Sequence, residues 1–300
     1  MTPPRPRGRR PREREVRRSR SSGPSHTTVP SARPKKLCEQ ASRAGDHRQL
    51  PPTIRSREAE REGLDETLFE RLARGDDGDD PIRSLLTTQF RMHERIQEFS
   101  SERFYDGILE PHPSVREHTL AGLLEHGDDV ADDHPALEPG DPLVFVDTSD
   151  ANASERSREG SPSTENPSEA DRVAAYADRL LEAGIDPAAL AVISPYADQV
   201  SRIEAELADR GIDDDALEID TVDGFQGREK AVVIVSLVRS NDRREVGFLD
   251  DPRRFNVALT RARRKAIVVG DSDTVTAADV FADFLAYARE RGTVVDATAG

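Results

Sequence analysis

From residue 84 to residue 291, short apolar runs alternate with longer amphipathic stretches. The apolar runs predict strands, and the stretches whose apolar residues recur every three or four positions predict helices. This alternation favours an α/β fold, a parallel sheet with helices on both faces. Functional residues in such folds gather in loops after the carboxyl ends of strands, so we expect the candidate residues there. Strands are expected at 84–88, 143–147, 190–194, 217–220, 231–237 and 265–270, and helices at 93–104, 166–181, 200–207, 252–260 and 277–291.

One helix start is marked by several side chains together. Asn166 can cap the first turn, Pro167 fits that turn because no donor is needed there, and Glu169 can reach back to the cap. Two other segments lack a periodic pattern. Residues 106–140 are acidic and proline-dotted, which indicates a surface excursion, and residues 148–165 are expected to form a polar loop.

The net charge of −15 is divided unevenly along the chain. Residues 1–44 contain 13 Arg and Lys against 3 Glu, together with 7 of the 20 prolines, so this basic segment cannot bury enough apolar surface to fold and is expected to be disordered. The remaining residues carry a net charge of −25. Because lysine is scarce and Asp and Glu abundant, we expect a salt-rich cytoplasm and a halophilic archaeon as the source.

The composition also excludes several classes of protein. The single cysteine, Cys38, rules out an internal disulfide and a thiolate-rich zinc site. No second histidine follows His93 at metal-binding spacing, so no metal site is expected. The longest apolar run, residues 231–238, is too short to span a bilayer, and the basic N-terminus has no apolar core behind it. We therefore expect a cytoplasmic protein with no membrane partner.

The segment TVDGFQGREK, residues 221–230, lies between two expected strands. Its two glycines allow the backbone to approach a ligand closely, and the polar groups between them can meet phosphate or ribose oxygens. A tight turn with a solvated run of charges would have the same composition, so the local pattern leaves both interpretations open.

The segment PRRFNVALTRARR, residues 252–264, concentrates arginines in an otherwise acidic region. Asn256, Thr260 and Arg263 are expected near one side of a helix. Guanidinium groups suit phosphate because they form paired charge-assisted hydrogen bonds. The alternative is a basic face that anchors acidic neighbours, and the segment alone does not decide between them.

Two further segments are weaker when taken alone. In QFRMH, residues 89–93, an aromatic ring beside an arginine could stack a base while the arginine meets a phosphate. The alternative, favoured on local pattern, places Phe90 and Met92 in the core and leaves Arg91 as a surface charge. Residues 45–52, GDHRQLPP, contain ordinary turn elements.

Taken together, these four segments resemble superfamily 1 helicases of the nonsense-mediated-decay and Dna2-like group. In that family GDxxQLPP is motif III, QYRMH is motif IV, VDxFQGxE is motif V, and NVALTRAR belongs to motif VI. The resemblance covers roughly residues 45–290. It implies a RecA-like parallel sheet of P-loop-NTPase type, namely the second motor domain of an ATP-dependent helicase that moves along single-stranded DNA or RNA.

The resemblance also implies roles for individual residues, with ATP and Mg²⁺ as cofactors of the intact enzyme. Gln49 would sense the γ-phosphate, and Phe90 would stack on adenine where the family usually has tyrosine. Arg91 and Arg261 would be arginine fingers on the transferred phosphoryl group. Gly227 and Glu229 would line the nucleotide site. Thr221 and Asp223 would lie nearer the nucleic-acid backbone.

The expected domain organisation follows from these motifs. Residues 1–44 would be the disordered basic segment, either a genuine arm or out-of-frame sequence, and residues 45–80 a remnant of the first motor domain carrying motif III. Residues 81–291 would form the second RecA-like domain, followed by a tail at 292–300.

No lysine in the chain follows a glycine, so a Walker A motif is absent, and residues 39–42 only faintly echo a Walker B segment. This chain is therefore predicted to be inactive alone. Three interpretations compete: a truncated or frame-disrupted helicase, a split enzyme whose first motor domain is a separate chain, and a catalytically dead nucleic-acid-binding or scaffold module. A metabolic nucleotide-binding enzyme is disfavoured because no GxGxxG follows the first strand.

Overall fold

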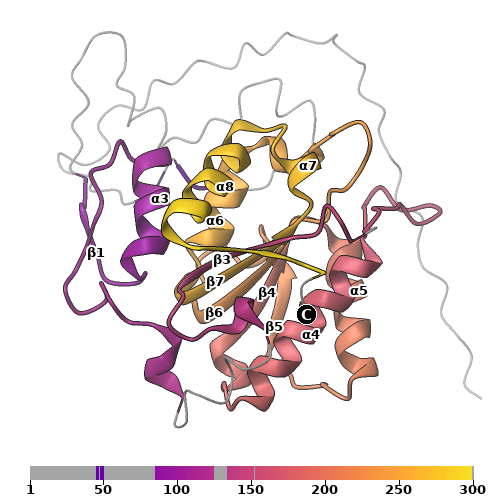
Figure 1. The fold of residues 1–300 in the computed structure, drawn as a ribbon, viewed down its shortest axis with the longest axis horizontal. Coiled ribbons are helices and arrows are strands. Elements are labelled where there is room, and N and C mark those ends of the chain that lie inside the picture. Colours follow the sequence, from indigo (N-terminus) through magenta and orange to yellow (C-terminus); the bar gives the residue numbers. More distant parts are fainter. Residues whose placement is uncertain (1–44, 47, 51–84, 125–133, 152, 299–300) are drawn as a thin grey trace, which may run out of the picture. The chain divides into compact units, whose positions relative to one another are not determined.

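The computed structural model describes residues 45–46, 48–50, 85–124, 134–151 and 153–298 (Figure 1). Contacts between residues divide the chain into two units, Met1–Arg43 and Ala44–Gly300. The whole first unit lies outside the described residues, and so do residues 51–84. The predictions made for the basic segment, and for most of the first-domain remnant, therefore fall outside the described part.

Six strands form one sheet in the order β5-β4-β6-β7-β3-β8, and each neighbouring pair is parallel. Helices pack on both faces, which confirms the predicted α/β class (Figure 1). The strands are β3 (Leu143–Asp147), β4 (Leu190–Ser194), β5 (Glu218–Thr221), β6 (Lys230–Ser236), β7 (Ala262–Gly270) and β8 (Thr293–Asp296). The α-helices are α3 (Glu94–Phe104), α4 (Pro167–Glu182), α5 (Ala197–Asp209), α6 (Pro252–Leu259), α7 (Ser272–Val275) and α8 (Asp279–Arg291). A two-stranded parallel pair, β1 (Thr88–Gln89) with β2 (Glu110–Pro111), lies outside this sheet, and short 3₁₀ turns occur at Leu120–Leu123, Pro135–Leu137, Pro187–Ala189 and Gly247–Asp250.

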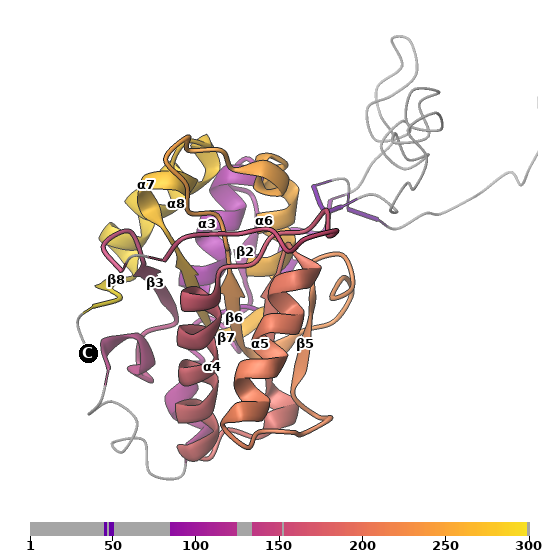
Figure 2. The same cartoon turned by 90° about the vertical axis from the view of Figure 1, so that its right-hand side faces the viewer.

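Each central strand is buried on both faces, which explains why the strands read as unbroken apolar runs. Along β3, Val144 and Val146 join the core beneath α4 and α5, whereas Leu143 and Phe145 join the core beneath α3, α6 and α8. Figure 2 shows α4 and α5 side by side, apart from the other three helices.

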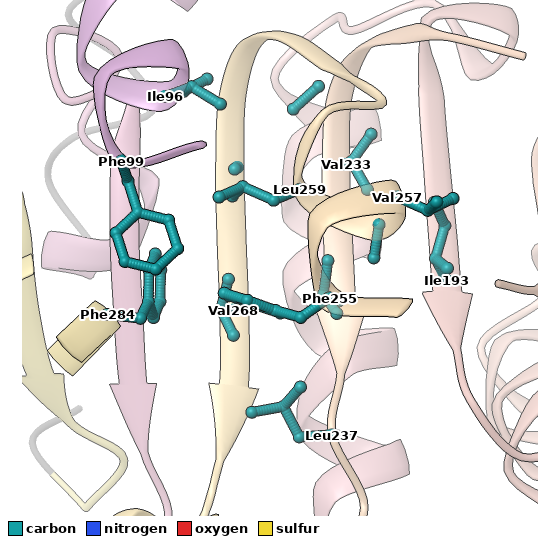
Figure 3. Close-up of a cluster of buried hydrophobic side chains, with 14 of the residues drawn as sticks. Ile96, Phe99, Ile193, Val233, Leu237, Phe255, Val257, Leu259, Val268 and Phe284 are labelled. Atoms are coloured by element: carbon teal, nitrogen blue, oxygen red, sulfur yellow. The ribbon is translucent and has the colours of Figure 1, made fainter. Parts of the chain in front are cut away.

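Three phenylalanines from three helices meet in the second of these cores (Figure 3). The ring of Phe284 in α8 lies 5.1 Å from that of Phe99 in α3 and 4.8 Å from that of Phe255 in α6, both edge to face. Aromatic pairs favour this arrangement because it sets the positive edge of one ring against the negative face of another. The cluster packs α6 against the sheet, and Arg261 follows shortly after the end of this helix.

Helix α4 begins where the sequence predicts, but one contact at its start differs. Asn166 accepts a hydrogen bond from the Glu169 amide at 3.1 Å, as expected of the cap. The prediction that Glu169 reaches back to the cap is wrong. The Asn166 amide donates instead to Gln199 in α5 at 2.7 Å, and the Glu169 carboxylate turns inward to Ser236 and Val238 at the end of β6.

Three boundaries also differ from the sequence predictions. Of the strand expected at 84–88, residue 84 lies outside the described residues, and among residues 85–88 only Thr88 is strand, because Leu85 and Leu86 are exposed. The segment 106–140 is not a simple surface excursion, since Leu120, Ala136 and Leu137 are buried in the core. The expected tail supplies β8, which pairs with β3 and buries Val295.

Candidate functional site

Two of the candidate residues lie where neighbouring strands begin. Glu229 directly precedes β6, Arg261 directly precedes β7, and the first residues of these strands pair with each other. The two side chains therefore share the amino edge of the sheet, not the carboxyl edge that the sequence analysis predicted. The prediction was wrong because the segments that carry Glu229 and Arg261 lead back to the amino edge. Each of these residues comes at the end of its connection, directly before the next strand begins.

Arg261 is buried, with 1 % of its surface exposed. Its Nε donates to the carbonyl of Val257 at 3.0 Å, and its Nη1 donates to the carbonyl of Arg228 at 3.2 Å. Its Nη2 donates to the side chains of Thr260 and Gln49, both at 3.2 Å. Within the described part of the chain, all of these partners are neutral and no carboxylate forms a salt bridge with Arg261.

Burial lowers the pKa of Arg261 to about 10, the nearby positive charge of Arg91 adds to the effect, and the nearby carboxylates of Glu229 and Asp46 act against it. The group remains protonated at neutral pH. A buried charge that no carboxylate contacts directly is costly, and the cost falls when an anion binds beside it. Arg261 therefore has the electrostatics of an anion-binding group.

The segment 45–50 is held against this edge by its backbone and side chains. Gln226 Nε2 donates to the carbonyl of Leu50 at 2.9 Å, and Asn256 Nδ2 donates to the carbonyl of Arg48 at 3.0 Å. The Leu50 side chain is buried in the core that contains α6. These contacts place the side chain of Gln49 within hydrogen-bonding distance of Arg261.

Asp46 ties the same segment to the end of α3. Its Oδ2 accepts a hydrogen bond from the Tyr105 hydroxyl at 2.6 Å and another from Gln49 Nε2 at 2.9 Å. Burial and the Asp46 carboxylate raise the pKa of Tyr105, so its hydroxyl stays a donor. No role was predicted for Asp46, Tyr105 or Gln226, although Asp46 and Gln226 belong to two of the motif segments.

The turn that carries Phe90 and Arg91 is fixed by the side chain of Gln89. Gln89 Oε1 accepts from the amides of Arg91 and Met92 at 2.7 and 2.8 Å, and Gln89 Nε2 donates to the Met92 carbonyl at 2.8 Å. Met92 is buried in the core, whereas Phe90 is 61 % exposed. The interpretation that placed both side chains in the core is therefore right for Met92 and wrong for Phe90, and the stacking role of Phe90 stays a prediction.

Arg91 points toward the start of β6. Its guanidinium forms an ion pair with Glu229 and donates to the carbonyl of Thr260 at 3.2 Å. Glu229 also lies 3.8 Å from the guanidinium of Arg263. Glu229 therefore supplies a counter-charge for Arg91, while Arg263 lies in β7 and not on a helix side with Asn256 and Thr260 as predicted.

The remaining candidates lie elsewhere on the motif V loop. Gly227 has φ +88°, a left-handed conformation that favours glycine. Thr221 ends β5 at the carboxyl edge, where its Oγ1 accepts from the Gly224 amide at 3.2 Å, and Asp223 is exposed in the turn that follows. The structure thus brings Gln49, Arg91, Glu229 and Arg261 together and places Thr221 at the opposite edge of the sheet.

The other arginines of residues 252–264 have structural contacts. Arg253 pairs with Asp251 at 3.0 Å, and the guanidinium of Arg254 lies 4.9 Å from the ring centre of Phe248. Arg264 donates to the carbonyl of Thr119 at 2.8 Å. Arg253 thus anchors an acidic neighbour, as the alternative interpretation predicted, and Arg254 lies 3.9 Å from the same Asp251 carboxylate, whereas Arg264 has a neutral partner. Arg261 differs from all three in its burial.

A polar hollow of about 490 Å³ lies at the carboxyl edge, away from Arg261. Its lining comes from the segments after β3, β6 and β7 and includes Ser149, Asn241, Arg244, Asp271 and Thr274. Ligands of parallel sheets commonly bind at this edge. Among the described residues, no group of three or more His, Cys, Asp or Glu side chains could hold a metal ion, and none of the helices described is both long and apolar enough to cross a membrane.

Comparison with known proteins identifies the family. The AAA domain family matches residues 64–273 of the chain. The chain belongs to this family. Among its relatives, DNA-binding protein SMUBP-2 of Mesocricetus auratus is 43 % identical over 251 residues, which are 84 % of this chain and 24 % of that protein. An uncharacterized ATP-dependent helicase of Methanocaldococcus jannaschii is 36 % identical over 246 residues, which are 82 % of this chain and 34 % of that protein.

A solved structure is also similar to this AAA domain chain. It is the C-terminal domain of a possible DNA helicase from Lactobacillus plantarum, with a TM-score of 0.35 and 13 % identity over 61 % of this chain and 88 % of that chain. The named relatives support the resemblance to superfamily 1 helicases. The chain spans between about a quarter and a third of the length of the curated relatives described above.

Proposed function

We propose that this chain is the C-terminal part of an ATP-dependent superfamily 1 helicase of the nonsense-mediated-decay and Dna2-like group, and that its amino edge is one half of an ATP site. The intact enzyme couples ATP hydrolysis to translocation on single-stranded DNA or RNA. The observation that supports this most strongly is Arg261, a buried guanidinium whose partners among the described residues are all neutral.

Each residue at the amino edge then has a chemical role. Arg261 and Arg91 stabilise the charge that develops on the transferred phosphoryl group, as arginine fingers do. Gln49 Oε1 accepts from Arg261 Nη2, so a phosphate oxygen that takes its place releases Gln49. Because the segment 45–50 carries Gln49, phosphate binding is transmitted to that segment, which makes Gln49 the γ-phosphate sensor.

The remaining candidate residues are assigned either to the nucleotide or to the single strand. The exposed ring of Phe90 stacks on adenine, and Gly227 and Glu229 line the nucleotide site. Thr221 and Asp223 contact the backbone of the single strand from the carboxyl edge of β5. Motors of this kind bind a strand through its phosphates and stacked bases with little sequence reading.

The two cofactors fit these residues differently. The phosphates of ATP fit, because Arg261 is a buried cation without a carboxylate partner in the described part. Mg²⁺ does not fit a site on the described residues, which provide no cluster of ligands for it. In this proposal the first motor domain holds Mg²⁺.

The first motor domain is the principal partner, either in cis in a longer parent chain or in trans as a separate chain. A Walker A lysine that reaches the β- and γ-phosphates has no counterpart in this sequence. The chain is accordingly inactive alone, and its arginine fingers complete a site whose phosphate cradle comes from the partner.

Complementation tests this proposal. The purified chain is mixed with a first motor domain that carries the Walker motifs, and magnesium-dependent ATP turnover is measured with and without single-stranded DNA and RNA. We expect turnover only in the mixture, with a loss of about 10³-fold for Arg261→Lys and Arg91→Ala, the range reported for arginine fingers. The exposed Arg289→Ala is the matched control and should keep full turnover.

A catalytically dead nucleic-acid-binding or scaffold module is the second candidate, and the missing glycine–lysine pair favours it. Strand binding by the chain alone, with no turnover in any mixture, would establish it in place of the first proposal.

We further propose that the protein works in the salt-rich cytoplasm of a halophilic archaeon. The support is the net charge of −25 on residues 45–300. Stability against unfolding should then rise with KCl concentration, because the salt screens repulsion within the acidic surface. Greatest stability in dilute buffer would contradict this.

A further inference from the structure

We propose that His112 is a positioning residue for the nucleobase: it covers one face of the Phe90 ring and fixes that ring so that the opposite face receives adenine. The inference rests on the proposed function, which makes Phe90 the base-stacking residue. His112 adds a second ring to that site and defines which face of Phe90 is free.

The contact between the two rings is close and nearly parallel. Their centroids lie 4.2 Å apart at an interplanar angle of 26°. Phe90 nevertheless stays 61 % exposed, and His112 is the only ring stacked on it among the described residues. Stacking on one face therefore leaves a large apolar surface for a planar ligand.

His112 is itself held in place by its neighbours. Its amide donates to the Gln89 carbonyl at 2.8 Å, which continues the pairing of β1 with β2. Its Nδ1 accepts from the Ser114 amide at 3.2 Å and lies 2.8 Å from the Ser114 hydroxyl. These contacts restrict both the backbone and the ring, so the imidazole is a fixed support. An exposed phenylalanine on a turn would otherwise lose rotamer freedom when a base binds, which weakens binding.

The platform formed by Phe90 and His112 is also fixed relative to the phosphate-binding groups. Phe90 precedes Arg91, and Gln89 locks the backbone of both through three hydrogen bonds. Arg91 in turn reaches Thr260, the neighbour of Arg261. The distance from the base platform to the guanidinium groups is thus set by one rigid turn. A ligand that carries a base and a phosphate chain fits both ends, which favours a nucleotide over free phosphate.

The test uses the full chain and the fluorescent nucleotide 1,N⁶-ethenoadenosine triphosphate, titrated beside inorganic tripolyphosphate. We expect His112→Ala to weaken binding of the ethenoadenosine nucleotide about two- to tenfold, the range of an aromatic stacking contact, and to leave tripolyphosphate binding unchanged. His112→Phe should restore nucleotide binding, because it keeps a flat ring against Phe90. Circular dichroism confirms that each variant is folded.

The outcomes separate this inference from the proposed function. Unchanged nucleotide binding in His112→Ala overturns the role of His112 alone. Equal weakening of nucleotide and tripolyphosphate also overturns it, because the effect would then not concern the base. Failure of the wild-type chain to bind either ligand, or binding of both that is insensitive to Arg91→Ala, overturns the proposed function and this inference with it.

Discussion

The two edges of the sheet treat a buried arginine in opposite ways. At the carboxyl edge, Arg239 pairs with the Glu155 carboxylate at 2.8 Å and contacts the Tyr196 hydroxyl at 3.2 Å. At the amino edge, Arg261 has only carbonyl, amide and hydroxyl partners in the described part of the chain. The first arginine is in direct contact with a carboxylate, whereas the second has nearby carboxylates but no ion pair among the described residues. The difference shows which edge the phosphate is expected to reach.

The carboxyl edge contains a residue with a strained backbone conformation, which buried side chains hold in place. Val238 has φ +73°, which a β-branched residue rarely adopts. The Glu169 carboxylate accepts from the Val238 amide at 2.9 Å and from the Ser236 hydroxyl at 2.6 Å, and Asn166 Nδ2 donates to the Val238 carbonyl at 3.1 Å. Both polar groups of Val238 are thus secured by buried side chains of the same helix start.

The largest effect on stability is expected from Asn166→Ala. This change removes the cap acceptor of α4 and two buried donated hydrogen bonds, to Ala153 and Val238. The free energy of unfolding should fall by about 3 kcal/mol, the sum of a helix cap and two buried hydrogen bonds. Urea denaturation measures it, with the exposed cap Asp186→Ala as a control expected to cost under about 1 kcal/mol. Equal losses in the two variants would show that the clamp on Val238 contributes nothing.

An effect of intermediate size is expected from Glu169→Gln, and it depends on pH. Burial raises the pKa of Glu169 from 4.5 to about 7, so the stability that the protonated form contributes is complete below about pH 4.5 and is lost as the pH rises through 7. Glutamine does not titrate. Relative to wild type, the variant should therefore gain about 2 kcal/mol between pH 5 and pH 8. Thermal unfolding across this range measures the gain, and a constant difference between the two proteins would contradict it.

The smallest effect concerns the amino edge itself. Glu229→Gln removes the counter-charge of Arg91 in a half-exposed ion pair, which should change the free energy of unfolding by under about 1 kcal/mol. Binding of tripolyphosphate should strengthen a few-fold, because the competing carboxylate is gone. Weaker binding would mean that Glu229 assists the anion and does not compete with it.

The contrast also shows which features a sequence can predict. Two strands could be predicted, Leu143–Asp147 and Leu190–Ser194, because a strand that is buried on both faces has a continuous run of apolar residues. The cap at Asn166 was predictable because it is local. The strand Thr293–Asp296 was missed, since only its pairing with β3 makes that short segment a strand.

The sequence predicted candidate residues that lie together in the structure, but not the edge of the sheet at which they lie. The motif wording points to Gln49, Arg91, Glu229 and Arg261, and the structure brings these four together. Their position at the amino edge depends on the direction in which each connection returns, and the inward turn of Glu169 depends on Ser236, 67 residues away. The local pattern placed Phe90 in the core for the same reason, and that interpretation is wrong because Phe90 lies on an exposed turn held by Gln89.

If the amino edge is half of an ATP site, it binds phosphate. Calorimetric titration of the chain with inorganic tripolyphosphate measures this binding, and it compares Arg91→Ala with Arg244→Ala, a change at an arginine that lines the hollow at the carboxyl edge. We predict that Arg91→Ala weakens binding at least tenfold, as the loss of a charge-assisted contact of about 1.4 kcal/mol or more requires, and that Arg244→Ala changes it by less than about twofold. Binding that depends on Arg244 and not on Arg91 would contradict the claim.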